Sequence, residues 1–269
     1  NRWAVLQLNS LKVAYGTRQI IADLSVAGLL AGTVTALLGP NGSGKSTLLK
    51  AIAGLNRLSG GQVLINGDDL THASFERRAR QVVYLPQDLP AAVHLQVFES
   101  VLVAANASAF GGPTGGKNVD GVARVDMTAV QSLLDRLGIG HLSMRYLDQL
   151  SGGQQQRAFL ARALAQQADL YLMDEPFAGV DASTEKSIID LFLSMKKEGK
   201  TIIVVHHDLQ SAINYFDWVL LINTRLVASG PVKDVFTTEL LQETYGGKLT
   251  LLTKIGELIK EKQFPIREQ

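Results

Sequence analysis

Apolar and polar residues alternate along the N-terminal part of the chain with the two-residue period of a β-strand. Val5–Tyr15 follows this alternation, and Ile20–Ala27 continues it after a short polar turn. Thr33–Leu38 carries no charge and is mostly apolar or β-branched, which predicts a strand buried on both faces. Further strands are predicted at Gln62–Ile65, Gln81–Leu85, Leu170–Met173, Thr201–Val205, Trp218–Ile222 and Leu226–Ala228.

Apolar residues at helical spacing lie between many of these strands. The predicted helices are Ser46–Gly54, Ser74–Arg80, Val97–Ala105, Met127–Leu137, Gln155–Ala165, Ala182–Lys197, Val232–Phe236 and Glu239–Tyr245. The strand–helix–strand order over 170–205 indicates parallel strands covered by helices. The pattern therefore predicts an α/β fold, with a mostly helical subdomain at about 88–165.

Three other stretches affect the predicted organisation. Ala107–Arg124 is rich in Gly, Ser and Ala, which predicts a flexible surface loop or insert. Leu249–Lys262 has one apolar and one charged face, so we expect an amphipathic helix that packs on its own domain; docking on a membrane or a partner is the alternative. Leu24–Gly44 is uncharged and long enough to span a membrane, but its glycines and Pro40 favour two buried strands and a loop.

Composition narrows the function classes. The 269 residues carry a formal net charge of +1, which argues against bulk electrostatic binding to nucleic acid. The chain has no cysteine, so disulfides, thiolate catalysis and cysteine metal sites are excluded. The first residues lack a signal-peptide pattern, and we expect any membrane role to come through a partner.

Gly39–Thr47 carries the pattern of a phosphate-binding loop, reading Gly-Pro-Asn-Gly-Ser-Gly-Lys-Ser-Thr. Its glycines let the backbone curl so that N–H groups face phosphate oxygens, and the following helix adds its positive dipole end. Lys45 can reach the β- and γ-phosphates of ATP, and the Ser46 hydroxyl can hold Mg²⁺. The candidate nucleotide-binding residues of the loop are Gly39, Asn41, Gly42, Ser43, Gly44, Lys45, Ser46 and Thr47. A strand before the loop and a helix after it favour this reading over an ordinary glycine-rich turn.

Two acids follow the apolar run at Leu170–Met173. Asp174, at the end of the strand, can hold Mg²⁺ through water, and Glu175 can polarise an attacking water as a general base. Solvated acids at the end of a strand are the alternative. The phosphate-binding loop upstream favours the catalytic reading.

Leu150–Gln154 reads Leu-Ser-Gly-Gly-Gln and opens the predicted helix Gln155–Ala165. A Ser-Gly-Gly helix start is a second candidate anion-binding end, with a free hydroxyl and exposed N–H groups. One ATP loop and a second phosphate-binding helix end suggest that the second end covers the nucleotide held by another chain.

The sequence resembles the nucleotide-binding subunit of an ATP-binding-cassette (ABC) transporter, from Leu6 to about Gly247. Leu150–Gln154 matches that family's signature word, at the expected place between the phosphate loop and the two acids. The resemblance implies a P-loop NTPase core with a mainly parallel sheet, an N-terminal antiparallel β-subdomain and a helical subdomain. It implies one ATP-binding domain over 1–247, followed by a C-terminal amphipathic helix and tail over 248–269.

The resemblance also implies roles for single residues. Tyr15 is similar to the aromatic residue that stacks on adenine, although a strand aromatic facing the core is the alternative. Gln87 resembles the glutamine that contacts Mg²⁺ and the attacking water, and Glu175 resembles the catalytic carboxylate. His207 resembles the histidine that hydrogen-bonds the γ-phosphate, and the adjacent His206 is the second candidate.

Further contacts are implied for the signature and for Mg²⁺. The signature and the turn after Glu175 would contribute Ser151, Gly152, Gly153, Gln154 and Asp181 to ATP binding, and Mg²⁺ would be held by Ser46, Gln87 and Asp174. The turn departs from the family pattern, because Gly179-Val180 precedes Asp181 where the family usually has a single leucine. A metal site at the two histidines is an alternative, but neighbours in a strand-to-helix turn point apart and no third ligand is evident.

The implied function is an ATPase subunit that energises a membrane importer. We expect two such subunits, both copies of this chain, to form a head-to-tail dimer. ATP and Mg²⁺ would lie between Lys45 and Ser46 of one chain and Ser151 and Gly153 of the other. The partners would be transmembrane permease subunits and, indirectly, an extracytoplasmic substrate-binding protein, with no nucleic acid. The implied location is the cytoplasmic face of the inner membrane.

The C-terminal part of the chain suggests the cargo. Four segments together resemble importers of manganese, zinc or iron: Val205–Leu209, Tyr215–Trp218, Ala228–Pro231 and Thr244–Gly247. Ser74–Leu85 and Phe98–Ala104, by contrast, resemble iron–siderophore importers. We therefore expect a metal ion or a metal chelate. The alternatives are a soluble ABC ATPase, such as an iron–sulfur assembly factor, and an exporter subunit.

Overall fold

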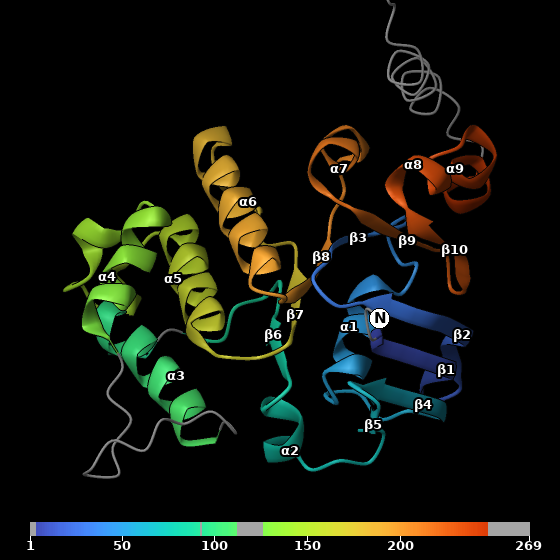
Figure 1. Cartoon of the computed structure of the whole chain (residues 1–269), viewed down its shortest axis with the longest axis horizontal. Coiled ribbons are helices and arrows are strands. Elements are labelled where there is room, and N and C mark those ends of the chain that lie inside the picture. Colours follow the sequence, from blue (N-terminus) through green and yellow to red (C-terminus); the bar gives the residue numbers. More distant parts are fainter. Residues whose placement is uncertain (1–3, 92, 112–125, 247–269) are drawn as a thin grey trace, which may run out of the picture. The chain divides into compact units, whose positions relative to one another are not determined.

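The computed structural model of the chain describes residues 4–91, 93–111 and 126–246, and of 107–111 it describes the backbone only (Figure 1). Two compact units make up the chain: Asn1–Thr71 with Ile203–Gln269, and His72–Ile202. Most of the predicted loop at Ala107–Arg124 and the whole of the predicted helix at Leu249–Lys262 lie outside the described residues. The single-domain assignment over 1–247, with a helical subdomain at about 88–165, stays a prediction.

The first unit contains a four-stranded antiparallel sheet in the order β2-β1-β4-β5. Its strands are β1 (Ala4–Tyr15), β2 (Arg18–Leu30), β4 (Gly60–Ile65) and β5 (Asp68–Asp69). The predicted alternation is confirmed, because every second residue of β1 from Leu6 to Leu8 and from Leu11 to Val13 is fully buried. Strand β2 continues beyond the predicted Ala27, since its pairing with β1 extends as far as Leu30 opposite Ala4.

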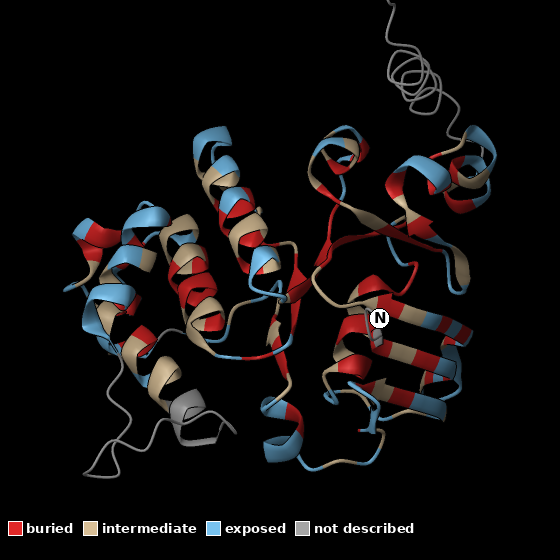
Figure 2. Cartoon of the chain, viewed as in Figure 1, coloured by how far each residue is buried: buried red, intermediate tan, exposed pale blue. Residues whose placement is uncertain are grey.

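The first unit also contains three strands outside this sheet, together with several helices. Their bounds are β3 (Val34–Leu38), β9 (Trp218–Ile222), β10 (Leu226–Pro231), α1 (Lys45–Ile52), α7 (Leu209–Tyr215), α8 (Val232–Val235) and α9 (Thr238–Tyr245). Strand β3 is parallel to β9, and β9 forms the predicted hairpin with β10. All five residues of β3 are buried, as its apolar pattern predicts (Figure 2).

The second unit combines a parallel strand pair with a group of helices. Its elements are α2 (Phe75–Ala79), β6 (Val82–Leu85), α3 (Val97–Gly111), α4 (Met127–Arg136), α5 (Gly152–Ala165), β7 (Leu170–Asp174) and α6 (Ala182–Lys197), with short 3-10 turns at Gly140–Leu142 and Leu147–Gln149. Strand β8 (Thr201–Val205) begins in this unit and continues into the first. Helices α3, α4 and α5 pack on one another (Figure 1).

The predicted end of α3 was wrong. The helix continues from Ala105 to Gly111, into the stretch that we expected to be a loop. Asn, Ala, Ser and Phe at 106–110 do not break a helix, so the helical run proceeds until the glycines begin. Among the described helices, none is both long and apolar enough to cross a membrane.

Gly61 in β4 shows how closely the backbones of the antiparallel sheet approach each other. Its φ is +88°, and a Cβ atom built on it would lie 2.4 Å from the Ser10 carbonyl oxygen and 2.6 Å from that of Asn9. Ser10 itself has a φ of +45°, in a part of β1 where the register with β4 shifts. By contrast, Gly16 in the β1–β2 turn has a φ of +59° and nothing within 4 Å of its Cβ position.

We expect Gly61→Ala to destabilise the protein much more than Gly16→Ala. Both substitutions place a side chain at a left-handed backbone position, which costs about 1 kcal/mol. Only Gly61→Ala also forces a methyl group against backbone atoms, and overpacking of this kind adds about 2 kcal/mol. Urea unfolding of the two variants measures the difference, and equal free energies of unfolding would contradict the close approach at Gly61.

Candidate functional site

The phosphate loop joins the end of β3 to the start of α1. Gly42 and Gly44 have φ values of +78° and +98°, the left-handed conformation that lets the loop curl. A Cβ atom on Gly39 would lie 2.1 Å from the Ile222 carbonyl oxygen, so only glycine fits beside β9. Gly44 makes no side-chain cap to α1, which leaves the first-turn N–H groups of this helix available to an anion.

Lys45 is folded back into this loop. Its Nζ donates hydrogen bonds to the carbonyl oxygens of Gly39, at 2.8 Å, and Pro40, at 2.9 Å, and the residue is only 7% exposed. Two carbonyl dipoles therefore solvate the buried ammonium group, at the place where phosphate oxygens are expected to bind. The remaining predicted residues of the loop differ in exposure: Asn41 and Gly42 are exposed, Ser46 and Thr47 are half-buried, and Ser43 is buried.

Tyr15 lies at the end of β1 with about half of its surface exposed. The exposed fraction is 51%, and its hydroxyl accepts a hydrogen bond of 2.7 Å from the Asn56 side-chain amide. The core-facing alternative for this residue is therefore wrong. An exposed ring at the end of a strand suits stacking on a nucleotide base, which stays a prediction.

The two adjacent histidines after β8 lie in different environments. His206 is buried, its ring contacts the Ser211 hydroxyl, and it packs against Phe216 with the ring centroids 5.5 Å apart. His207 is exposed. The ring of His206 is thus engaged inside the protein, whereas His207 can meet a ligand, which favours His207 for the γ-phosphate role.

In the second unit, the two acids follow β7 as expected. Asp174 is the last residue of β7 and only 1% exposed, and the Tyr84 hydroxyl on the neighbouring strand β6 donates to its Oδ2 at 3.5 Å. Glu175 has a φ of +54°, an uncommon conformation for a residue with a long side chain, and is half-buried. Strain at a residue of this kind costs about 1 kcal/mol and is typical of functional sites. Gln87, two residues beyond β6, is exposed.

The signature segment forms a capping box at the start of α5. The Ser151 hydroxyl accepts the Gln154 N–H at 3.4 Å, and the Gln154 side chain accepts the Ser151 N–H at 3.0 Å. The predicted free hydroxyl is therefore wrong, because this hydroxyl accepts a helix N–H. The Ser-x-x-Gln spacing would have indicated the box. The start of α5 also lies close to the turn after Glu175, since a Cβ atom on Gly153 would be 3.2 Å from the Gly179 carbonyl oxygen.

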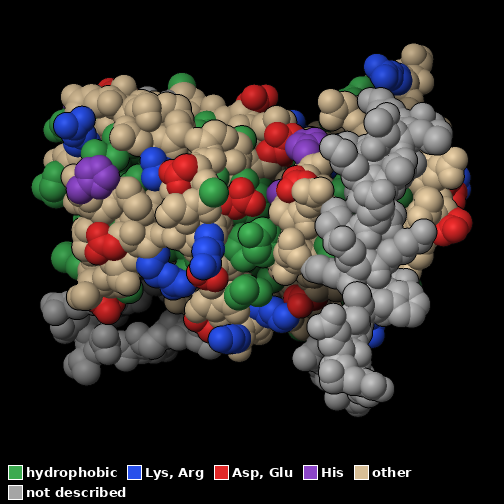
Figure 3. Space-filling model, turned by 90° about the horizontal axis from the view of Figure 1, so that it is seen from above, with side chains coloured by type: hydrophobic (Ala, Val, Ile, Leu, Met, Phe, Trp, Pro, Cys, Tyr) green, Lys and Arg blue, Asp and Glu red, His purple; other side chains and the backbone are tan. Residues whose placement is uncertain are grey.

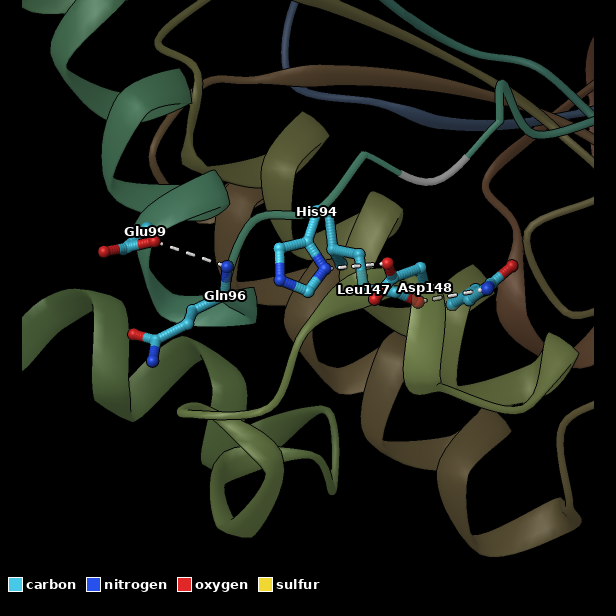
Figure 4. Close-up of polar contacts among 6 residues, drawn as sticks. His94, Gln96, Glu99, Leu147 and Asp148 are labelled. Atoms are coloured by element: carbon cyan, nitrogen blue, oxygen red, sulfur yellow. Dashed lines mark hydrogen bonds and ion pairs between the residues drawn. The ribbon is translucent and has the colours of Figure 1, made fainter.

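The segment over 94–96 is bonded to the segment over 146–148, which precedes the signature in the chain (Figure 4). Gln96 and Tyr146 pair as an antiparallel bridge, and the Leu147 N–H donates to the Leu95 carbonyl at 2.9 Å. His94 Nδ1 lies 2.9 Å from Asp148 Oδ2, and its ring stacks on Tyr146 at 3.9 Å. The segment that follows Gln87 is thereby attached to the segment that precedes Ser151. Nothing in the sequence pattern indicated this link.

Asp181 caps helix α6. Its carboxylate accepts the Thr184 N–H at 2.8 Å and the Thr184 hydroxyl at 3.1 Å. Both bonds hold the pKa of Asp181 below its usual value, and the bond from the backbone N–H has the larger effect. The carboxylate is nevertheless fully exposed. A capping role explains its position locally, and a contact to a second chain stays a prediction.

Charged side chains of both signs are interspersed on the face in Figure 3, in keeping with the net charge of +1. The phosphate loop supplies its own Lys45 and backbone N–H groups for anion binding. A loop of this geometry between a buried strand and a helix defines a P-loop nucleotide-binding protein.

Comparison with known proteins identifies the family. The family model described as "ABC transporter" matches residues 25–178. The manganese transport system ATP-binding protein of Bacillus subtilis is 42% identical over 92% of this chain and 94% of its own length. The zinc transport system ATP-binding protein of Treponema pallidum is 43% identical, over 91% of this chain and 88% of its own length.

Solved structures agree with this assignment. The ATP-binding subunit of an ABC transporter superposes with a TM-score of 0.74 at 25% identity, covering 93% of this chain and 99% of that structure. The cbiO1 protein of Clostridium perfringens, part of an ABC transporter complex, gives 0.71 at 27% identity, covering 96% and 99%. The chain belongs to the ABC transporter family. It is an ABC transporter ATPase, and it binds ATP.

The buried His206 makes stability depend on pH. Burial lowers the pKa of its imidazole below the ordinary value of 6.5, with the neighbouring Asp208 acting in the opposite sense. The unfolded chain therefore binds a proton more readily than the native protein. The stabilisation is complete above pH 6.5 and is lost as pH falls from 6.5 towards the native pKa.

We expect His206→Gln to flatten the pH dependence of stability below pH 6.5, because the glutamine side chain does not titrate and can still meet Ser211. The measurement is the free energy of unfolding at several pH values on both sides of 6.5. His207→Gln is the matched control, since His207 is exposed, and it should follow the wild-type profile. If His207→Gln flattens the pH dependence of the free energy of unfolding more than His206→Gln does, His206 is not the histidine that causes this dependence.

Proposed function

We propose that this chain is the ATP-binding and ATP-hydrolysing subunit of a transport system that moves manganese or zinc into the cell. The observation that carries the proposal is the 42–43% identity to ATP-binding proteins of manganese and zinc transport systems over more than nine-tenths of the chain. The identity extends well beyond the motifs that all P-loop proteins share. No group of this chain needs to touch the metal, which would cross through separate membrane subunits.

In this proposal the first unit binds the nucleotide. Lys45 leaves the Gly39 and Pro40 carbonyls for the β- and γ-phosphates, whose charge is a stronger partner for an ammonium group than two neutral dipoles. The exposed ring of Tyr15 stacks on adenine, and the exposed His207 hydrogen-bonds the γ-phosphate. The loop backbone and the first turn of α1 supply further N–H donors.

The hydrolytic residues in this proposal come from the second unit. Glu175 polarises the attacking water, and its left-handed backbone aims its side chain differently from that of Asp174. Mg²⁺ prefers oxygen ligands, and the hydroxyl of Ser46, the amide of Gln87 and the buried carboxylate of Asp174 fit this preference. The ion, when bound, neutralises charge that develops on the phosphates.

Two copies of the chain would complete the reaction. Ser151 and Gly153 of a second copy would cover the γ-phosphate, because the start of α5 presents N–H groups and a serine hydroxyl that can still donate its proton. ATP favours the paired state, since only that state gains contacts to both copies, and hydrolysis releases it. Permease subunits would hold the pair at the cytoplasmic face of the membrane, and an extracytoplasmic binding protein would deliver the metal.

We expect Glu175→Gln to lower the rate of ATP hydrolysis by a factor of about 10²–10⁴ while ATP binding is retained, because the amide cannot accept the proton of the water. The measurements are phosphate release and, with ATP present, the molecular mass in solution, which should shift to that of a stable dimer. Glu198→Gln, an exposed carboxylate at the end of α6, is the matched control and should hydrolyse ATP normally. Turnover at the wild-type rate in Glu175→Gln would remove Glu175 from the role of base.

The cargo is tested in cells that depend on this subunit. With Glu175→Gln in place of the wild type, we expect the content of manganese or zinc to fall several-fold, because transport stops when hydrolysis stops. Elemental analysis of washed cells measures both metals, and the wild-type and Glu198→Gln strains are the controls. Unchanged manganese and zinc, together with co-purification of a soluble assembly factor in place of a membrane permease, would overturn the proposed cargo and partners.

A further inference from the structure

The two histidines after β8 lie in a short link that is anchored at both ends. Strand β8 ends at Val205, and helix α7 has Asp208 as its N-cap. Only His206 and His207 lie between them. The His206 N–H donates to the carbonyl of Leu37 in β3 at 3.2 Å, and β3 leads directly into the phosphate loop. The backbone that precedes His207 is therefore bonded to the strand that carries the loop.

Ser211, in the first turn of α7, joins the two residues that flank His207. Asp208 Oδ2 accepts the Ser211 N–H at 3.2 Å, and the Ser211 hydroxyl donates to the Asp208 carbonyl at 3.2 Å. The same hydroxyl contacts Nε2 of His206. Because the hydroxyl has one proton and directs it at the carbonyl, it accepts at the imidazole, which places a hydrogen on Nε2. We call His206, Asp208 and Ser211 the clasp, since their bonds close a ring that includes the backbone of His207.

The imidazole of His206 is held inside the protein by more than one contact. The residue is 8% exposed, and its ring lies 5.5 Å from that of Phe216, the C-cap of α7, at an angle of 45°. A buried polar ring is unfavourable unless it is hydrogen-bonded, and an apolar side chain would fill the space without needing Ser211. A satisfied polar contact specifies one arrangement of the groups that it joins. In this case the arrangement fixes the link from which the exposed His207 projects.

We propose that His206 and Ser211 are positioning residues for ATP hydrolysis, which hold the backbone of His207 so that its imidazole meets the γ-phosphate. The inference rests on the proposed function, in which His207 makes that contact. Neither residue of the pair would touch the nucleotide. Binding energy comes from Lys45 and the loop N–H groups, whereas the reaction depends on exact placement of the groups around the γ-phosphate, so the clasp affects kcat and leaves KM nearly unchanged.

The test removes the Ser211 hydroxyl and restores it. Phosphate release by Ser211→Ala should show a kcat about threefold to tenfold below that of the wild type, the worth of one neutral hydrogen bond, with KM for ATP within about twofold. Ser211→Thr retains a hydroxyl and should recover at least about half of the wild-type kcat. Ser187→Ala is the matched control and should hydrolyse ATP normally, because it also removes a serine hydroxyl that donates to a carbonyl of its own helix.

The histidine side of the clasp gives a second, independent pair of variants. His206→Phe keeps a ring beside Phe216 but has no N–H to donate, so it should lower kcat as Ser211→Ala does. His206→Gln can still donate to Ser211 and should keep most of the wild-type kcat. Combining His206→Phe with Ser211→Ala should cost no more than either change alone, because both remove the same bond.

The outcomes separate this inference from the proposed function. His207→Ala should lower kcat further than either clasp variant, and adding Ser211→Ala to it should have no additional effect, because the clasp acts through His207. If His207→Ala loses hydrolysis while Ser211→Ala and His206→Phe keep the wild-type kcat, the positioning role is overturned and the proposed function stands. A loss of kcat that only matches the unfolded fraction, measured by circular dichroism at the assay temperature, would also overturn it. If His207→Ala hydrolyses ATP at the wild-type rate, its γ-phosphate contact fails, and the role of the clasp fails with it.

Discussion

The buried ammonium group of Lys45 is the constraint on which the first unit depends. A charge in the interior needs polar partners, and here the Gly39 and Pro40 carbonyls provide them. Those carbonyls can point inward only if the loop curls, which requires the left-handed glycines and a residue without a side chain at Gly39, against the Ile222 carbonyl. That contact in turn requires β3 to run parallel beside β9, so the sheet, the loop and the charge specify one another.

The second unit holds its functional groups with different devices. A buried strand carries Asp174 into the interior, and Glu175 follows it in a strained left-handed conformation. At the signature, a reciprocal pair of hydrogen bonds fixes Ser151 at the start of α5. The bridge between Gln96 and Tyr146 holds the chain that precedes it. The groups proposed to act on ATP are therefore held by short-range geometry that does not require the ligand.

Most of the strands, the phosphate loop and the signature could be predicted from sequence, because each depends on neighbours within a few residues. Alternation specified β1, and the spacing of glycines and Lys45 specified the loop. The ends of β2 and α3 were missed, for different reasons. Strand β2 is lengthened by its pairing with β1, and helix α3 continues as far as Gly111. The capping box at Ser151 was present in the sequence and was overlooked. The contact of His94 with Asp148 joins distant residues, and no local pattern encodes it.

The affinity of this loop for a nucleotide is a difference between two sets of contacts. Binding a phosphate gives Lys45 a charged partner, but it also removes the ammonium group from the carbonyls of Gly39 and Pro40. The Pro40 carbonyl keeps the Ser43 N–H as a donor, whereas the buried Gly39 carbonyl loses the ammonium group. The end of β9 limits how the loop can move, because the Ile222 carbonyl lies directly against Gly39. Two proteins that share every residue touching phosphate can therefore differ in affinity when their nucleotide-free loops differ in stability.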